Sequence, residues 1–253
     1  RARRGDSVTE TPTVAQIDVV QDRTPGSRCD EGFLRLKRLT LRNTYTDGTV
    51  SPEYPCDIVS RRRVDAVAVV LWHRDPEIGK IYVHFREGSR PPVWLRRSKA
   101  SELPLIDHPP YDVFGEIVAG VLEEEDLGEP GLRERAAIEA FEEAGFVVKP
   151  ADIVQLGGGL FPSPGVTDEK IYLLAAEVNP AARQPAPGDG SVHETGTRVV
   201  CQELRLALEA CRTGHMPDAK SELGLMRLAA HVGYLPELDM FVQDLPAALQ
   251  QAY

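Results

Sequence analysis

Three glutamates in one short segment are the residues of this chain best suited to chemistry. Glu139, Glu142 and Glu143 are spaced i, i+3 and i+4, and in a helix this spacing places the three carboxylates on one side. Like charges at this spacing destabilise a helix unless a cation lies between them. Carboxylate oxygens are hard ligands that suit Mg²⁺, so the triplet is a candidate metal site. Acidic helix faces are also common as solvated surface, and the spacing alone leaves both interpretations open.

The residues around the triplet predict a helix with one buried face. Ala137, Phe141 and Ala144 form an apolar stripe at i, i+4 and i+7, with Ile138 beside it, and such a stripe is typical of a helix packed on a core. A glycine-bearing loop precedes the helix, and Gly145 is placed to end it.

Residues 116–146 resemble the Nudix box, a loop–helix–loop signature. Gly120 matches its opening glycine and Glu129 its loop glutamate, and the three helical glutamates and Gly145 match its end. Two flanking segments, EIVAG at 116–120 and PSPGVTDE at 162–169, resemble those of ADP-ribose pyrophosphatases. Several matched pieces together are far more specific than any one of them.

The chain departs from the Nudix signature in two places. The loop between Gly120 and Glu129 is longer than the pattern, an insertion that a surface loop absorbs at small entropic cost. Ile138 stands where the family has an arginine that holds the glutamates in place. Arg135, one turn before Glu139, would supply part of that role through an i, i+4 pair, worth about a few tenths of a kcal/mol when exposed. Weaker activity or an altered substrate would follow.

The resemblance implies a metal site and a catalytic base. Glu139, Glu142, Glu143 and the main-chain carbonyl of Ala119 would hold Mg²⁺, with Mn²⁺ as the alternative, and Glu142 and Glu143 would also count as catalytic residues. Glu194 is the best match to a catalytic glutamate that the family carries in a late loop. The neighbouring His193 is a competing base, and an exposed loop glutamate is the plainer alternative.

Substrate contacts are also implied by the resemblance. Arg86 and Arg90 stand in a segment that resembles the end of a strand in the family. An arginine at that place would donate two hydrogen bonds to a phosphate. A solvated strand end is the competing interpretation. Glu116 and Glu169, in the two flanking segments, are further candidates for substrate binding.

These residues together imply Mg²⁺-dependent hydrolysis of the pyrophosphate bond of a nucleoside diphosphate sugar. ADP-ribose, split to AMP and ribose 5-phosphate, is the first expectation. A UDP-glucose-type nucleotide-sugar diphosphatase is one alternative, and a Nudix-fold nucleotide-binding module with weak catalysis is another. Ile138 favours the binding module, whereas the carboxylates favour the enzyme.

Composition and charge limit the kinds of partner and compartment that are expected for this chain. The chain has 253 residues and a net charge of −10, which argues against a general nucleic-acid binder. The longest apolar run, Ala66 to Trp72, is too short to span a bilayer, and no targeting segment is visible, so a cytoplasmic protein without membrane contact is expected. The four cysteines lack CxxC spacing and are interpreted as isolated thiols in a reducing compartment, not as a disulfide framework or a zinc site.

The predicted fold class is α/β, a Nudix α/β/α sandwich with a mixed sheet preceded by a small antiparallel N-terminal unit. Residues 1–28 are expected to form a flexible arm, 29–62 the antiparallel unit, and 63–253 the hydrolase domain with C-terminal helices. In the N-terminal unit, a strand from Leu34 would carry a bulge at Lys37-Arg38. Such a unit often exchanges across a dimer in the family, which implies a homodimer. The final helices are predicted at 219–233 and 237–251.

Overall fold

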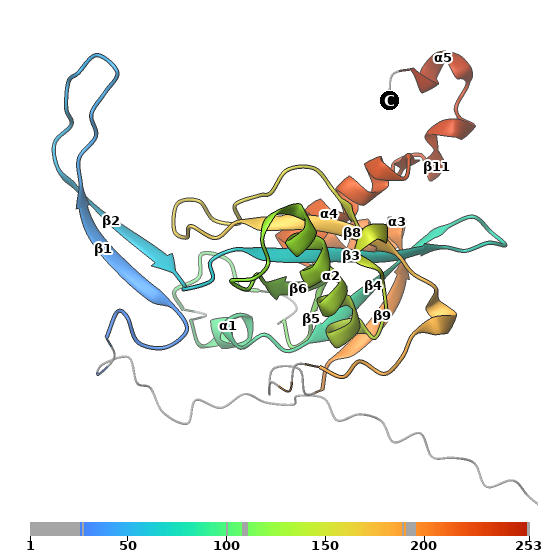
Figure 1. Ribbon diagram of the computed structural model, residues 1–253, viewed down its shortest axis with the longest axis horizontal. Helices are drawn as coiled ribbons and strands as arrows, with labels where there is room; N and C mark the ends of the chain where they lie inside the picture. The colour runs from blue at the N-terminus through green and yellow to red at the C-terminus, as the bar shows by residue number, and fades with distance from the viewer. Residues whose placement is uncertain are drawn as a thin grey trace, which may run out of the picture.

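The computed structural model describes Gly26 and residues 28–99, 101–107, 111–188, 190 and 196–251. In this part of the chain a seven-stranded mixed sheet carries helices on both faces, and a separate two-stranded sheet lies to one side (Figure 1). The fold is therefore mixed α/β, as the sequence predicted. The flexible arm predicted for residues 1–28 lies almost entirely outside the described residues.

The centre of the large sheet is β3 (Ala66–Arg74). One of its edges runs parallel to β8 (Ile171–Glu177). The other edge pairs antiparallel with β6 (Val118–Val121) over its first half and with β4 (Ile81–Gly88) over its second half. Antiparallel partners extend the sheet further: β5 (Phe114–Glu116) and β9 (Arg198–Glu203) beside β4, and β7 (Val154–Gln155) beside β8.

Alternate residues of β3 contribute to two hydrophobic cores. Val67, Val69 and Leu71 pack toward α2 (Gly128–Ala144), whereas Ala68 and Val70 pack toward α3 (Leu204–Arg212) and α4 (Ala219–His231). Successive side chains of a strand point to opposite faces, so a strand covered on both faces is apolar throughout. This explains the continuous apolar run of the sequence.

The buried face of α2 differs from the predicted stripe. Phe141 is half-buried and Ile138 is 41% exposed. Apart from Gly131, the buried residues of α2 lie in a row at four-residue spacing: Leu132, Ala136, Ala140 and Ala144. Because alanine side chains are small, this row lets the helix approach the sheet closely. The adjacent side of the helix, which carries the glutamates, therefore lies close to β6. Gly145 ends the helix in the left-handed conformation, with φ 74°, as predicted.

The prediction of a helix at 237–251 is wrong. After α4 the chain forms a hairpin of β10 (Tyr234–Leu235) and β11 (Met240–Phe241), a 3₁₀ turn at Val242–Asp244 and the short α5 (Ala247–Gln250). Gly233 with φ 66° ends the preceding helical turn, and Asp239 with φ 50° forms the hairpin bend. The Tyr234 hydroxyl donates to the Asp239 carboxylate at 2.6 Å. Local turn chemistry thus overrides the helical periodicity.

The two-stranded sheet consists of β1 (Arg35–Leu41) and β2 (Tyr54–Ser60). Its register is unbroken from Arg35↔Ser60 to Leu41↔Tyr54, so the expected bulge at Lys37-Arg38 is absent. The hairpin projects from the body of the molecule (Figure 1), and most of its side chains are exposed on both faces. Because neither face has to be buried throughout, the phase slip in the sequence requires no bulge.

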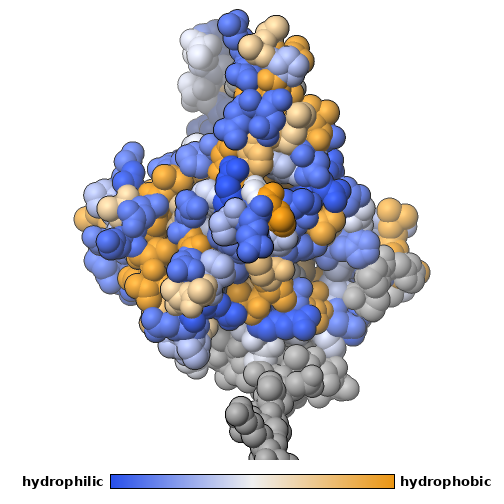
Figure 2. All heavy atoms as spheres, turned by 90° about the vertical axis from the view of Figure 1, so that its right-hand side faces the viewer, coloured by the Kyte–Doolittle hydropathy of each residue, from blue (hydrophilic) through white to orange (hydrophobic). Residues whose placement is uncertain are grey.

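The remaining helical turns are short: α1 (Pro91–Trp94) and 3₁₀ turns at Leu95–Lys99, Pro150–Asp152 and Pro180–Ala182. Among the described residues, no helix has the length and apolar character needed to cross a bilayer. On the face of the molecule in Figure 2, apolar side chains lie in several separate patches among polar ones.

Candidate active site

The glutamate triplet of α2 lines one wall of a pocket of about 750 Å³. Glu139, Glu142 and Glu143 face this pocket together with Ala119 and Gly120 of β6. The structure therefore brings together the residues that the sequence predicted as metal ligands. The close packing of α2 on the sheet brings this about, since it places the glutamates over the main chain of β6.

Gly120 permits this close approach. A Cβ atom at position 120 would lie 1.9 Å from Oε1 of Glu139, far inside van der Waals contact. Any side chain here would displace the carboxylate. The carboxylate oxygens of α2 and the main chain of β6 together form a set of hard donors that fits Mg²⁺.

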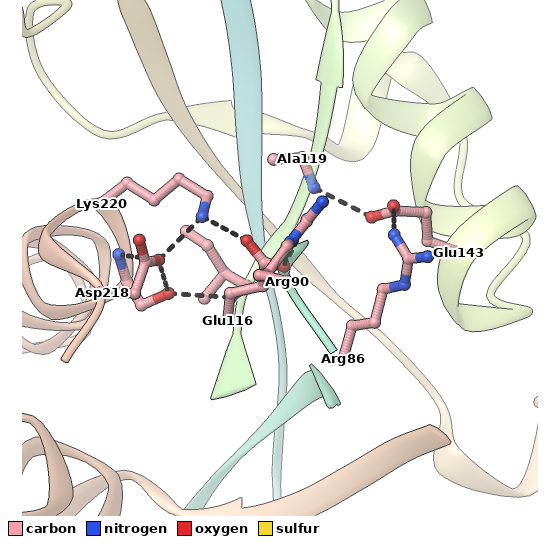
Figure 3. Close-up of polar contacts among 9 residues, drawn as sticks. Arg86, Arg90, Glu116, Ala119, Glu143, Asp218 and Lys220 are labelled. Carbon is pink, nitrogen blue, oxygen red and sulfur yellow. Dashed lines mark hydrogen bonds and ion pairs between the residues drawn. The ribbon is translucent and has the colours of Figure 1, made fainter. Parts of the chain in front are cut away.

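Glu143 is largely enclosed, with 9% of its side chain exposed. One of its oxygens pairs with the guanidinium of Arg86 from β4, and the other accepts a hydrogen bond from the Ala119 N–H at 3.1 Å (Figure 3). Burial raises the pKa of Glu143 above its ordinary value, although Arg86 and the Ala119 N–H act in the opposite direction. A carboxylate has about four lone-pair positions, so two remain for further ligands.

Arg135 occupies the position that the sequence assigned to it. Its Nη1 lies 3.9 Å from Oε1 of Glu139, and its Nε donates to the Asp126 carboxylate at 2.8 Å. Asp126 also accepts from the Glu123 N–H at 2.7 Å. The sequence did not single out Asp126, which holds Arg135 in place from the loop before the helix. Ile138, where the family has its arginine, points toward solvent.

Glu129 does not occupy the place expected for the loop glutamate. It lies in the first turn of α2 with its side chain 73% exposed, 3.8 Å from Arg133. It therefore belongs to the helix and not to the loop before it. The early carboxylate that lines the pocket is instead Glu123.

The pocket also has basic lining residues. Arg35, Arg61, Arg62 and Arg63 line it beside the acidic residues. Each arginine of the 61–63 turn has an acidic partner: Arg61 contacts Glu169 at 2.5 Å, Arg62 contacts Glu124 at 2.6 Å, and Arg63 contacts Glu123. Glu169, predicted to bind substrate, thus orients an arginine of the pocket.

Glu116 belongs to a second, adjoining ion network. Its carboxylate accepts from Arg90 Nε at 2.6 Å and from Lys220 Nζ at 2.6 Å, and Lys220 also contacts Asp218 at 2.9 Å (Figure 3). Burial alone would raise the pKa of Glu116, but the two cations outweigh it and lower the pKa below its ordinary value. Burial would lower the pKa of Lys220, yet its two carboxylate partners raise it.

Sequence reasoning missed Lys220 and Asp218. Asp218 is the N-cap of α4 and accepts from the Ser221 N–H at 3.1 Å, and an aspartate before a predicted helix is a recognisable capping signal. Lys220 had no such signal, because its carboxylate partner Glu116 is 104 positions away.

The remaining predicted site residues differ in where the structure places them. Arg86, predicted to contact substrate, is 6% exposed and pairs with Glu143. The side chain of Arg90 is more exposed and pairs with Glu116. The expected base Glu194 and its competitor His193 lie outside the described residues.

A comparison with protein-family models gave no match, and a comparison with curated proteins gave none either. The Nudix resemblance therefore rests on the motif residues of segment 116–169.

Proposed function

We propose that this chain has a Nudix fold and is a Mg²⁺-dependent hydrolase of the pyrophosphate bond in a nucleoside diphosphate sugar, with ADP-ribose as the first substrate to test. The observation that carries the proposal is one pocket with an acidic wall from α2 and a basic wall from Arg61–Arg63. Cleavage of a pyrophosphate needs a place for cations and a place for phosphate oxygens. The pocket offers both.

Each pocket residue then has a role. Mg²⁺ held by Glu139, Glu142, Glu143 and the Ala119 carbonyl would neutralise phosphate oxygens and lower the pKa of a bound water. Arg86 orients Glu143 and favours its ionised form. Gly120 leaves room for Glu139 beside the main chain.

The basic wall would bind the diphosphate. Arginine forks onto phosphate oxygens in two parallel hydrogen bonds. Arg62 is exposed and Arg63 partly so, and both can exchange a glutamate partner for a phosphate. Glu194 stays the proposed base. A UDP-glucose-type substrate fits the same two walls, since the diphosphate is the shared element.

One observation favours the second candidate, a nucleotide-binding module with weak catalysis. Both oxygens of Glu143 already have partners, Arg86 and the Ala119 N–H. In an active site this carboxylate must still offer a lone pair to the metal ion. In a binding module the same contacts would simply neutralise a buried charge.

Product analysis with ADP-ribose, UDP-glucose and ADP-glucose, each with Mg²⁺ or Mn²⁺, tests the proposal. We expect metal-dependent release of a nucleoside monophosphate, reduced about 100-fold or more by Glu142→Gln or Glu143→Gln. Glu134→Gln, an exposed position of the same helix, is the matched control and should retain activity. Tight nucleotide binding without turnover of any of the three would replace the enzyme with the binding module.

A further inference from the structure

Two histidines and a cysteine meet on the α2 face of the large sheet, outside the pocket described above. His73 lies on β3, His84 on β4 and Cys201 on β9. His84 and Cys201 are directly opposed across the β4–β9 pair, and His73 pairs with Tyr82, two residues from His84. Because the side-chain period of a strand is two, all three side chains project from the same face.

The distances between the ligand atoms suit a metal ion. Nδ1 of His73 lies 3.1 Å from Nε2 of His84, and one ring nitrogen of each histidine and the Cys201 sulfur all lie within 4.8 Å of one another. In a tetrahedral zinc site with the usual bond lengths, ligand atoms are about 3.3 to 3.6 Å apart. Small side-chain rotations would therefore bring the sulfur into place.

The surroundings favour neutral imidazoles and tolerate a cation. His84 is buried and packs edge-on against Phe146, with ring centroids 4.7 Å apart. Asp75 and Glu177 lie near enough to His73 to act on it electrostatically, whereas Arg183 acts on His84. Two carboxylates and one guanidinium leave a net negative environment for a bound ion.

We infer that His73, His84 and Cys201 form a binding site for a borderline divalent metal ion, Zn²⁺, with a water completing the coordination. Two imidazoles and a thiolate are poor ligands for Mg²⁺ but good ones for zinc. Binding forms the Zn–S bond as the Cys201 thiol loses its proton to solvent. The ion would join β9 to β3 and β4, two strands from a much earlier part of the sequence, and it would fix β9 to the sheet.

Spectroscopy of the full chain with Co²⁺ in place of zinc tests this site. After chelator treatment, one equivalent of Co²⁺ should give a thiolate-to-metal charge-transfer band and the intense visible bands of tetrahedral cobalt. Cys201→Ser should abolish the charge-transfer band and weaken Zn²⁺ binding about 100-fold. Cys56→Ser, on the projecting hairpin, is the matched control and should change neither.

A measurement on the unmodified chain makes the test independent of variant folding. Zn²⁺ should protect Cys201 from alkylation, read by peptide mass mapping, whereas the exposed Cys29 should react at an unchanged rate. A weak octahedral cobalt spectrum without a thiolate band, or equal alkylation of Cys201 with and without zinc, would overturn the proposal. The two histidines would then be a hydrogen-bonded pair and nothing more.

Discussion

At the scale of single residues, the acidic wall depends on one glycine. Gly120 leaves no space for a Cβ atom, because that atom would lie 1.9 Å from the Glu139 carboxylate. The spacing of the glutamates places them on one side of α2, but this glycine decides whether Glu139 reaches β6. Selection for a metal site would therefore act on Gly120 as strongly as on the carboxylates.

Gly120→Ala is predicted to displace Glu139 and to lower Mn²⁺ affinity and any metal-dependent hydrolysis about 100-fold. The free energy of unfolding should fall by about 1 to 3 kcal/mol through overpacking. Metal titration and urea denaturation measure the two effects. Gly158→Ala, where a Cβ would meet nothing within 4 Å, is the control. Unchanged metal affinity in Gly120→Ala would show that Glu139 is not a ligand.

His84 gives a prediction for the pH dependence of stability. Burial, together with His73 and Arg183, lowers the pKa of His84 to about 4 from an ordinary value of 6.5. The folded state thus disfavours the charged ring. The contribution of the neutral His84 to the free energy of unfolding is complete above about pH 6.5 and is lost as the pH falls toward 4. In the metal-free protein the free energy of unfolding should drop by about 1 to 2 kcal/mol between pH 7 and 5, after allowance for solvent screening.

Chemical denaturation at a series of pH values measures this effect. His84→Gln cannot be protonated in this range and should show a flatter profile between pH 7 and 5. Equal slopes for the two proteins would assign the pH dependence to other groups.

At the scale of elements, a buried ion network fastens α4 to the sheet. Lys220 stands between Glu116, next to β6, and Asp218, the N-cap of α4. In the same contact region the Ser221 hydroxyl accepts a hydrogen bond from the Ile117 N–H at 2.9 Å. These contacts fix the strand from which Ala119 and Gly120 continue, so α4 positions the pocket from the opposite face of the sheet.

Lys220→Met is predicted to destabilise the protein by about 3 kcal/mol, because it leaves the buried Glu116 carboxylate and the partly buried Asp218 carboxylate short of a cation. The lysine side chain is 15% exposed, so solvent cannot replace it fully. Urea denaturation measures the loss, and Lys99→Met at an exposed position is the control. A change of less than about 0.5 kcal/mol would mean that Arg90 alone satisfies Glu116.

At the scale of the whole molecule, the β1–β2 hairpin stands out because none of its strand residues belongs to either of the two hydrophobic cores. An isolated two-stranded sheet is only marginally stable in water. Exposed apolar side chains lie on the strands of this hairpin, at Leu39 and Tyr54, and in its connecting loop, at Val50. A second copy of the chain is the partner that the sequence predicted, and the projecting hairpin is compatible with that prediction.

Light scattering is expected to show a homodimer. Leu39→Asp and Val50→Asp should shift it toward monomer, because each places a charge among the exposed apolar residues of the hairpin. Ile78→Asp, an equally exposed apolar residue at the β3–β4 turn, should leave the dimer intact. A monomer at every concentration would refute the dimer and leave the hairpin to another partner.

The sequence by itself determined what depends on neighbours along the chain. The spacing of the glutamates, the end of α2 at Gly145 and the buried strand β3 follow from helical and strand periodicity and from glycine chemistry. Local reasoning was wrong at residues 237–251, where turn residues outweighed a helical pattern, and at Glu129, which lies exposed in the first turn of α2 instead of in the loop.

Only the tertiary structure decided which charges meet when they are far apart in the sequence. Arg86 and Glu143 are 57 positions apart, and Glu116 and Lys220 are 104 apart. The His73, His84 and Cys201 cluster joins three strands with no motif spacing along the chain. Such contacts depend on the strand order of the sheet, which is set by the packing of the two cores and is not encoded in any local spacing.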